Sequence, residues 1–137
     1  MAMNRGPLIL PMGQHECLTA LGTVDLGRVA VTIGALPAIR PVRYAIHGGH
    51  AVFRAAPFSR LRSAAQDQVV AFQADQAGLP NGVGWTVDAR GRCHQVTSPE
   101  LLAQLEALAL PAWHQADARD VFLRIPLEHI SGHRVYW

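Results

Sequence analysis

The sequence of 137 residues predicts one mostly β domain, an antiparallel barrel of six or seven strands with a few short helices. Three observations favour this class. Several segments alternate apolar and polar residues with period two, a glycine-rich turn joins two of them directly, and the expected strands do not alternate strictly with helices. Hydrophobic residues make up 50% of the chain, which is enough for a single core spanning residues 1–137 without disulfides or a structural metal.

The first elements are a helix and a hairpin of strands. Residues 1–12 are expected to form an irregular extension, because Pro7 and Pro11 interrupt their apolar residues. Residues 14–21 predict a helix that ends before Gly22 and covers one end of the barrel. Strands are expected at residues 28–33, 38–46 and 51–54, and the His47-Gly48-Gly49-His50 turn predicts that the last two pair antiparallel.

The second half predicts two helices and four strands. Ser59 is an expected N-cap for a helix over residues 59–65, and Ser98-Pro99-Glu100 opens a second helix with a capping serine, a proline and an acid in the first turn. Alternation of Trp85, Val87 and Ala89 with polar neighbours predicts the longest strand. The strands are expected at residues 69–74, 84–96, 121–125 and 133–136.

Charge and cysteine usage exclude several classes of function. The formal net charge is only +2 and the arginines are dispersed, so no nucleic-acid partner is expected. No apolar run reaches the roughly 20 residues that a membrane span needs. Cys17 and Cys93 lack the spacing of a metal or redox site, so we expect a reduced, cytoplasmic location.

The arginine-rich turn after the strand at residues 51–54 is the strongest candidate for chemistry. Arg54 lies at the strand end, and Arg60 and Arg62 lie at the start of the following helix, whose free N–H groups favour an anion. Two interpretations are open from spacing alone: these arginines close on a phosphate, or they are solvated surface residues.

Other chemical motifs are weaker. The sequence contains no Walker loop, dinucleotide fingerprint or nucleophile elbow, so catalytic residues remain unassigned. Trp85 has two interpretations, as a ring that stacks on an aromatic ligand or as a core residue. No metal site is expected, because the histidines lie in separate elements without paired ligand spacing: His15, His47, His50, His94, His114, His129 and His133.

A succession of short segments carries a resemblance over residues 16–134. In order they are Glu16-Cys17-Leu18, Gly27-Arg28-Val29-Ala30-Val31, Pro41-Val42-Arg43-Tyr44, Val52-Phe53-Arg54, Ser59-Arg60-Leu61, Val70-Ala71-Phe72-Gln73-Ala74-Asp75, Gly84-Trp85-Thr86-Val87, Gly91-Arg92 and Ile130-Ser131-Gly132-His133-Arg134. With these segments the chain resembles the pyridoxamine 5′-phosphate oxidase-related, flavin-binding split-barrel family.

The resemblance implies a homodimeric six-stranded split barrel that holds FMN in grooves at the subunit boundary. It implies that a strand lies along the flavin ring, that a turn holds the phosphate and that the partner subunit completes the groove. The ring would meet Pro41, Val42, Arg43 and Tyr44; the phosphate would meet Arg54, Ser59 and Arg60, with Phe53, Ala55 and Leu61 beside them; the partner would supply Trp85, Thr86 and Val87.

The function implied is that of an FMN-dependent oxidoreductase acting on a small organic substrate, with the redox chemistry carried by the flavin. The chain departs from the family pattern at Ala55, where relatives often have threonine, and at Phe58, where they have glycine. Two alternatives therefore stay open. One is a relative that uses FAD or deazaflavin, and the other is a dimeric binding module that is not an enzyme and has lost productive flavin binding.

Overall fold

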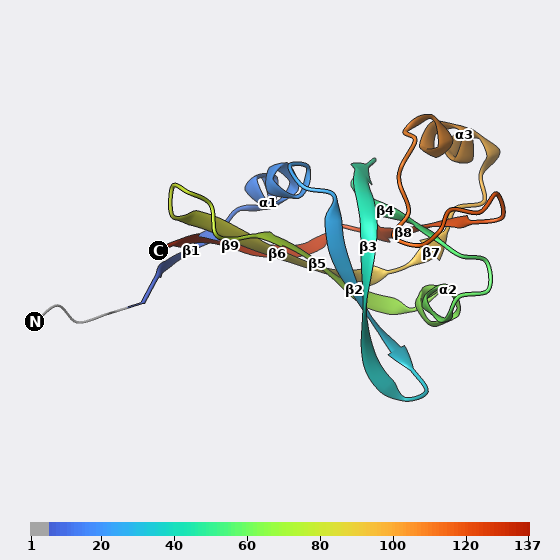
Figure 1. The fold of residues 1–137 in the computed structure, drawn as a ribbon, viewed down its shortest axis with the longest axis horizontal. Helices are drawn as coiled ribbons and strands as arrows, with labels where there is room; N and C mark the ends of the chain where they lie inside the picture. The colour runs from blue at the N-terminus through green and yellow to red at the C-terminus, as the bar shows by residue number, and fades with distance from the viewer. Residues whose placement is uncertain (1–5) are drawn as a thin grey trace, which may run out of the picture.

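Nine antiparallel strands form one continuous sheet in residues 6–137, the part of the chain that the computed structural model describes (Figure 1). Their order across the sheet is β1-β9-β6-β5-β2-β3-β4-β8-β7. The strands are β1 (Leu8–Met12), β2 (Leu26–Ile33), β3 (Leu36–His47), β4 (His50–Ala55), β5 (Val69–Gln76), β6 (Val83–Arg92), β7 (His94–Gln95), β8 (Val121–Pro126) and β9 (His129–Tyr136).

The sheet curls because one stretch of chain pairs at both of its ends. β6 pairs with β5 and β9, and after Cys93 the same stretch continues as β7 and pairs with β8. At this crossing the Cys93 N–H donates to the Gln68 carbonyl, and the Cys93 carbonyl accepts from the Asp67 N–H. The crossing satisfies the backbone groups that leave the ladder, and it brings the end of β6 against Pro126 of β8.

The turn between β3 and β4 is the tight hairpin that the sequence predicts. Gly48 and Gly49 have φ of 57° and 76°, and His47 pairs with His50 across the turn. Positive φ at both central residues matches the right-handed twist of the flanking strands. By contrast, the β2–β3 hairpin extends away from the body of the molecule (Figure 1).

The core lies inside the curled sheet, and β4 separates it from a smaller cluster. Phe53 and Ala55 of β4 face the main core, whereas Val52 faces a second cluster with Leu105 and Val96. Helix α3 (Pro99–Ala107) covers that second face, so both sides of β4 are buried. A strand buried on both faces is a rigid support for the side chains at its end.

The other two helices lie against opposite parts of the sheet. Helix α1 (Gln14–Leu21) has the predicted bounds and packs on β9 and β6. Helix α2 (Arg60–Ala65) packs against β2, and the predicted cap is present because Ser59 Oγ accepts from the Arg62 N–H at 3.1 Å. No helix in residues 6–137 has the length and apolar character to cross a membrane.

Three sequence predictions need correction. The mostly β class is confirmed, but the described chain has nine strands rather than six. Residues 8–12 form β1, paired with β9, instead of an irregular extension, since the pairing satisfies their backbone groups; residues 1–5 of that prediction lie outside the described residues. The strand predicted over residues 84–96 divides at Cys93, so the longest strand is the 12-residue β3.

Candidate ligand-binding site

A cavity of about 340 Å³ opens where β3, β4 and α2 meet the α3–β8 loop (residues 108–120). Its charged lining residues are cationic only. It is lined by Arg40, Pro41, Val42, Arg54, Ala55, Ala56, Ser59, Arg60, Leu61, Trp113 and His114. The volume lies at the lower end of the roughly 300–1,000 Å³ that is typical of ligand sites.

Strand register explains why Arg40 reaches this cavity. Arg40 of β3 pairs with the core residue Val29 of β2, and directly paired residues project from the same face. Its Nη1 contacts only the carbonyl of the adjacent Ile39, at 3.0 Å. Sequence reasoning missed Arg40, although it immediately precedes the predicted segment at Pro41.

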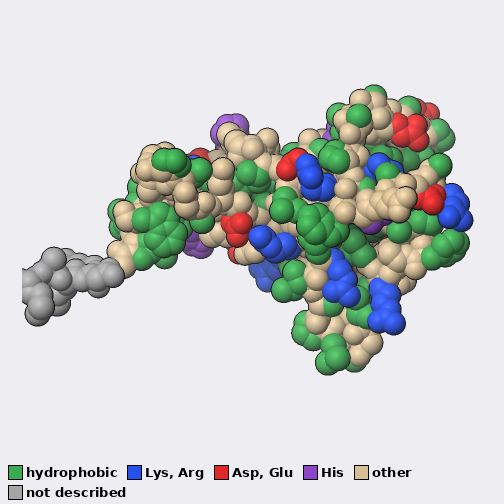
Figure 2. Space-filling view, in the orientation of Figure 1, with side chains coloured by type: hydrophobic (Ala, Val, Ile, Leu, Met, Phe, Trp, Pro, Cys, Tyr) green, Lys and Arg blue, Asp and Glu red, His purple; other side chains and the backbone are tan. Residues whose placement is uncertain are grey.

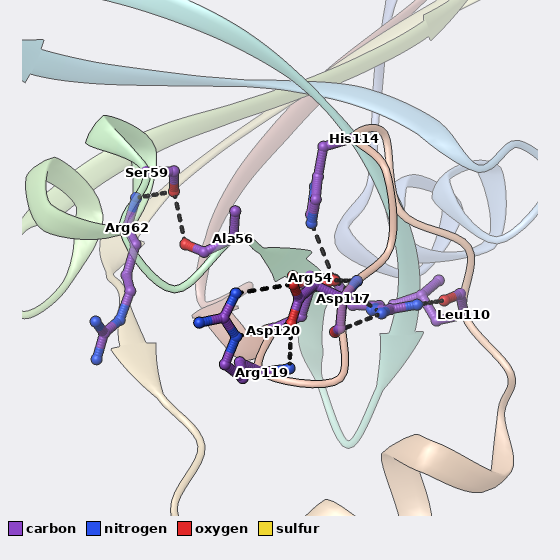
Figure 3. Close-up of polar contacts among 9 residues, drawn as sticks. All are labelled: Arg54, Ala56, Ser59, Arg62, Leu110, His114, Asp117, Arg119 and Asp120. Carbon is purple, nitrogen blue, oxygen red and sulfur yellow. Dashed lines mark hydrogen bonds and ion pairs between the residues drawn. The ribbon is translucent and has the colours of Figure 1, made fainter.

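Arg54 is bound to the α3–β8 loop (Figure 3). Its guanidinium donates to Asp120 Oδ2 at 2.8 Å, to the Leu110 carbonyl at 3.3 Å and to the Asp117 carbonyl at 3.5 Å. The side chain of Asp120 is 3% exposed and that of Arg54 is 21% exposed. A charge pair this sheltered is screened little by solvent.

Asp120 also meets a histidine from the same loop. His114 Nε2 lies 3.0 Å from Asp120 Oδ2, close enough for an ion pair but without the angle of a hydrogen bond (Figure 3). His114 Nε2 is buried and faces Asp120, so only the other atoms of the ring are exposed. Within residues 6–137, Asp120 Oδ1 is buried with no hydrogen-bond partner.

The two arginines of the turn differ in their availability. Arg62 donates to the Pro57 carbonyl at 2.7 Å and to Gln95 Oε1 at 3.0 Å, which ties the turn to β7. The Arg60 guanidinium lines the cavity and makes no hydrogen bond or ion pair to any described residue. Arg60 is therefore free to bind an anion, and Arg62 holds the turn in place.

The structure brings together most of the predicted ring and phosphate residues, with three exceptions. Arg43 pairs with Asp25 on the surface, and Phe53 is completely buried in the core. Tyr44 is also buried: its hydroxyl donates to the Leu21 carbonyl at 2.7 Å, and its ring packs edge-on against Phe72. Burial is the main cause that raises the pKa of Tyr44, and Asp25 adds to it.

Trp85, Thr86 and Val87 lie in β6, away from the cavity lining. Trp85 is 6% exposed and belongs to the main core, as the second interpretation of its position expected. The indole also borders a separate cavity of about 360 Å³ beside α1. Their predicted role as partner-subunit contacts stays a prediction.

Two further functional candidates, besides Arg40, were missed by sequence reasoning. Trp113 and His114 lie in the α3–β8 loop, more than 50 positions after the arginine-rich turn, and only the fold brings them to the cavity. Trp113 is 57% exposed, which is unusual for the largest apolar side chain and is visible only in the structure. No group of three or more potential metal ligands occurs among residues 6–137.

Fold and cavity together define an antiparallel split-barrel protein with a cation-lined cavity beside β4. Residues 13–134 match the model of the pyridoxamine 5′-phosphate oxidase family, and the chain belongs to this family.

Individual relatives agree with this assignment. The uncharacterized protein Rv0080 of Mycobacterium tuberculosis is 31% identical over 132 residues, covering 93% of this chain and 86% of its own length. A FAD-binding protein from Mycobacterium smegmatis is 27% identical with a TM-score of 0.80, covering 93% of this chain and 98% of that one. A provisionally named pyridoxamine 5′-phosphate oxidase from Corynebacterium glutamicum is 26% identical with a TM-score of 0.83, covering 95% and 100%.

Proposed function

We propose that this protein binds a flavin nucleotide and places its phosphate in the cavity beside β4. The observation that carries the proposal is the cavity's charge: Arg40, Arg54 and Arg60 line it, and no carboxylate is among its described lining residues. A cavity with one sign of charge attracts the opposite charge. Family membership and the similarity to a FAD-binding protein support a flavin as the source of that phosphate.

The donors present fit a flavin phosphate. Arg60 has unused donors, and Arg40 has only a neighbouring carbonyl as partner. Guanidinium groups suit phosphate because their N–H groups match its oxygens in pairs. Ser59 would add a hydroxyl from the start of α2, and the backbone of Pro41 and Val42 would border the ring.

We assign FMN as the first candidate ligand, with FAD and deazaflavin as alternatives that present phosphate to the same arginines. When bound, a flavin supplies hydride and electron transfer, so the protein itself need only bind, orient and shield the reacting groups. The activity proposed is oxidation or reduction of a small organic substrate. Its location is proposed as cytoplasmic, supported by the two buried free cysteines.

One observation favours a second candidate, a binding module without redox activity. Ala55 is 1% exposed and offers no hydroxyl where relatives often have threonine, and Phe58 is 87% exposed at the adjoining turn. Fewer phosphate contacts would lower flavin affinity while the fold persists.

We also propose a homodimer, supported by the outer face of the sheet. The strand register places five residues side by side in one row across this face. They are Ile39 of β3, Ala30 of β2, Ala71 of β5, Arg90 of β6 and His129 of β9. This row borders a cavity of about 700 Å³. The cavity carries apolar side chains with charges of both signs, the self-complementary mixture that a twofold interface needs.

The test of the flavin proposal is direct binding. Purified protein should be yellow, or should quench the fluorescence of added FMN, FAD or oxidised deazaflavin. Arg40→Ala with Arg60→Ala should weaken FMN binding, since each charge-assisted contact contributes about 1.5–3 kcal/mol. Arg92→Ala is the control, because Arg92 is an exposed arginine outside this cavity.

The outcomes separate the two candidates. Flavin binding with electron transfer to an added acceptor supports the oxidoreductase. Flavin binding without turnover against a panel of small acceptors favours the binding module. A colourless protein that binds none of the three flavins would overturn the flavin proposal and leave the binding module that has lost productive flavin binding.

A further inference from the structure

Arg54 lines the cavity, yet every hydrogen bond of its guanidinium goes to the α3–β8 loop. The acceptors are Asp120 Oδ2 and the carbonyls of Leu110 and Asp117, from both ends of that loop. Arg54 also borders a second cavity of about 470 Å³ on the α3 side of β4, which Asp117 and Asp120 line as well. Its guanidinium therefore lies between the two cavities and ties the loop to the end of β4.

Asp120 links this tie to the wall of the ligand cavity. The same Oδ2 that accepts from Arg54 also accepts from the Asp117 N–H at 3.2 Å and lies 3.0 Å from His114 Nε2. One carboxylate oxygen thus fixes the strand arginine, the loop backbone and a residue of the cavity wall (Figure 3).

Trp113 is adjacent in sequence to His114, the residue of the cavity wall that meets Asp120. It borders the cavity and is 57% exposed. An exposed indole beside a ligand cavity offers a flat apolar face on which a planar ring can stack. No other aromatic side chain lines this cavity in residues 6–137.

We propose a division of roles that deepens the proposed function and rests on it. Arg60 and Arg40 contact the ligand phosphate. Trp113 contacts the planar ring and thereby selects for aromatic ligands. Arg54 is a positioning residue that acts through Asp120 to hold Trp113 over the cavity.

Comparison of FMN with riboflavin tests this division, because riboflavin lacks the phosphate and keeps the ring. Loss of a phosphate contact lowers the affinity for FMN alone, whereas loss of a ring contact lowers the affinity for both ligands by the same factor. Arg60→Ala should weaken FMN about ten- to hundredfold and leave riboflavin unchanged. Trp113→Ala and Arg54→Gln should each weaken both ligands by a common factor of roughly ten, the size of one lost stacking contact.

Two further variants separate positioning from a general loss of structure. If Arg54 acts through Trp113, the double variant Arg54→Gln with Trp113→Ala binds no more weakly than Trp113→Ala alone. Asp120→Asn keeps the shape of the side chain and weakens the tie, so it should also weaken both ligands. If Arg54 were a phosphate contact, freeing it with Asp120→Asn would leave riboflavin unchanged and leave FMN binding equal or tighter.

Hydrogen exchange gives a readout without ligand. Arg54→Gln and Asp120→Asn should speed amide exchange in residues 108–120, and Arg60→Ala and the control Arg92→Ala should not. If Arg54→Gln fails to fold, Arg54→Lys replaces it, since lysine keeps the charge but lacks the planar fork of donors.

Three results would overturn the assignment: Arg54→Gln weakening FMN alone, Trp113→Ala weakening neither ligand, or additive losses in the double variant. Wild-type protein that binds none of FMN, FAD, deazaflavin and riboflavin would overturn the proposed function and this assignment with it. Wild-type binding together with any of the three results would leave flavin binding intact and remove only the division of roles.

Discussion

At the residue scale, burial controls the chemistry of both cysteines. Cys93 is completely buried at the crossing from β6 to β7, and this burial, with a smaller effect from Asp67, raises the pKa of its thiol to about 12. Burial, aided by Glu16, also raises the pKa of Cys17. Because the thiolate is the nucleophile, both cysteines should be inert in the folded protein.

Thiol labelling checks this expectation. Native protein at pH 8 should not react with Ellman's reagent, whereas protein unfolded in guanidinium should release the equivalent of its two cysteines. The raised pKa also sets a direction for stability: below about pH 8.5 the thiol is protonated in both states, and above it only the unfolded state ionises. The contribution of Cys93 is therefore lost as pH rises from about 8.5 towards its folded pKa of about 12. Rapid labelling of native protein would contradict this.

Residue patterns in the sequence predicted one side of the ligand cavity and missed the other. Ser59 and Arg60 are adjacent and carry a helix start that local rules recognise. Asp120 and His114 come from a loop without periodicity. Asp120 lies 66 positions after Arg54, its hydrogen-bond partner, in the sequence. Local sequence rules contain no information about such a pairing, so the tie between β4 and the loop could only come from the fold.

At the element scale, the fit of α1 on the sheet depends on a missing side chain. A Cβ at Gly132 of β9 would lie 2.8 Å from Cys17 Sγ and 2.9 Å from the Thr86 carbonyl oxygen. The backbone oxygen of a paired strand cannot move away without breaking the ladder. We therefore expect Gly132→Ala to destabilise the protein by about 1–3 kcal/mol, the usual cost of overpacking.

Denaturant unfolding with Gly132→Ala measures this cost. Gly13→Ala is the matched control, because nothing lies within 4 Å of the position that its methyl group would take and its φ is −71°. The control should change the free energy of unfolding by less than about 1 kcal/mol. Equal midpoints for both variants would show that α1 can move away from β9 at little cost.

The sequence predicted helices and strands well where local residues define their ends. It predicted them poorly where pairing with a distant strand defines their ends. The bounds of α1 and the β3–β4 hairpin followed from glycines and periodicity. Short strands such as β1 and β7 have no such signal, since they exist only through their partners β9 and β8. The break at Cys93 was missed for the same reason: apolar alternation continues through it while the hydrogen-bond partners change.

At the scale of the whole molecule, the outer face of the sheet exposes large apolar side chains. On this face Ile39 and Val69 are 65% and 64% exposed. Hydrophobic side chains also gather at the end of the protruding β2–β3 hairpin (Figure 2). Contiguous exposed apolar surface of this kind marks association sites. The split-barrel class was predictable from the sequence, and the homodimer that the resemblance implies stays a prediction.

The proposed dimer is tested by placing a charge in the centre of the outer face. Ile39→Asp leaves the core untouched, because the side chain points outward beside Ala30, and it should convert a dimer into monomers in sedimentation velocity at micromolar concentration. Leu108→Asp is the control, since Leu108 is 46% exposed at the end of α3. If the flavin site lies at the subunit boundary, Ile39→Asp should also weaken FMN binding in proportion to the monomer formed. A wild-type monomer at that concentration would contradict the dimer, and a dimer unaffected by Ile39→Asp would place the interface on another face.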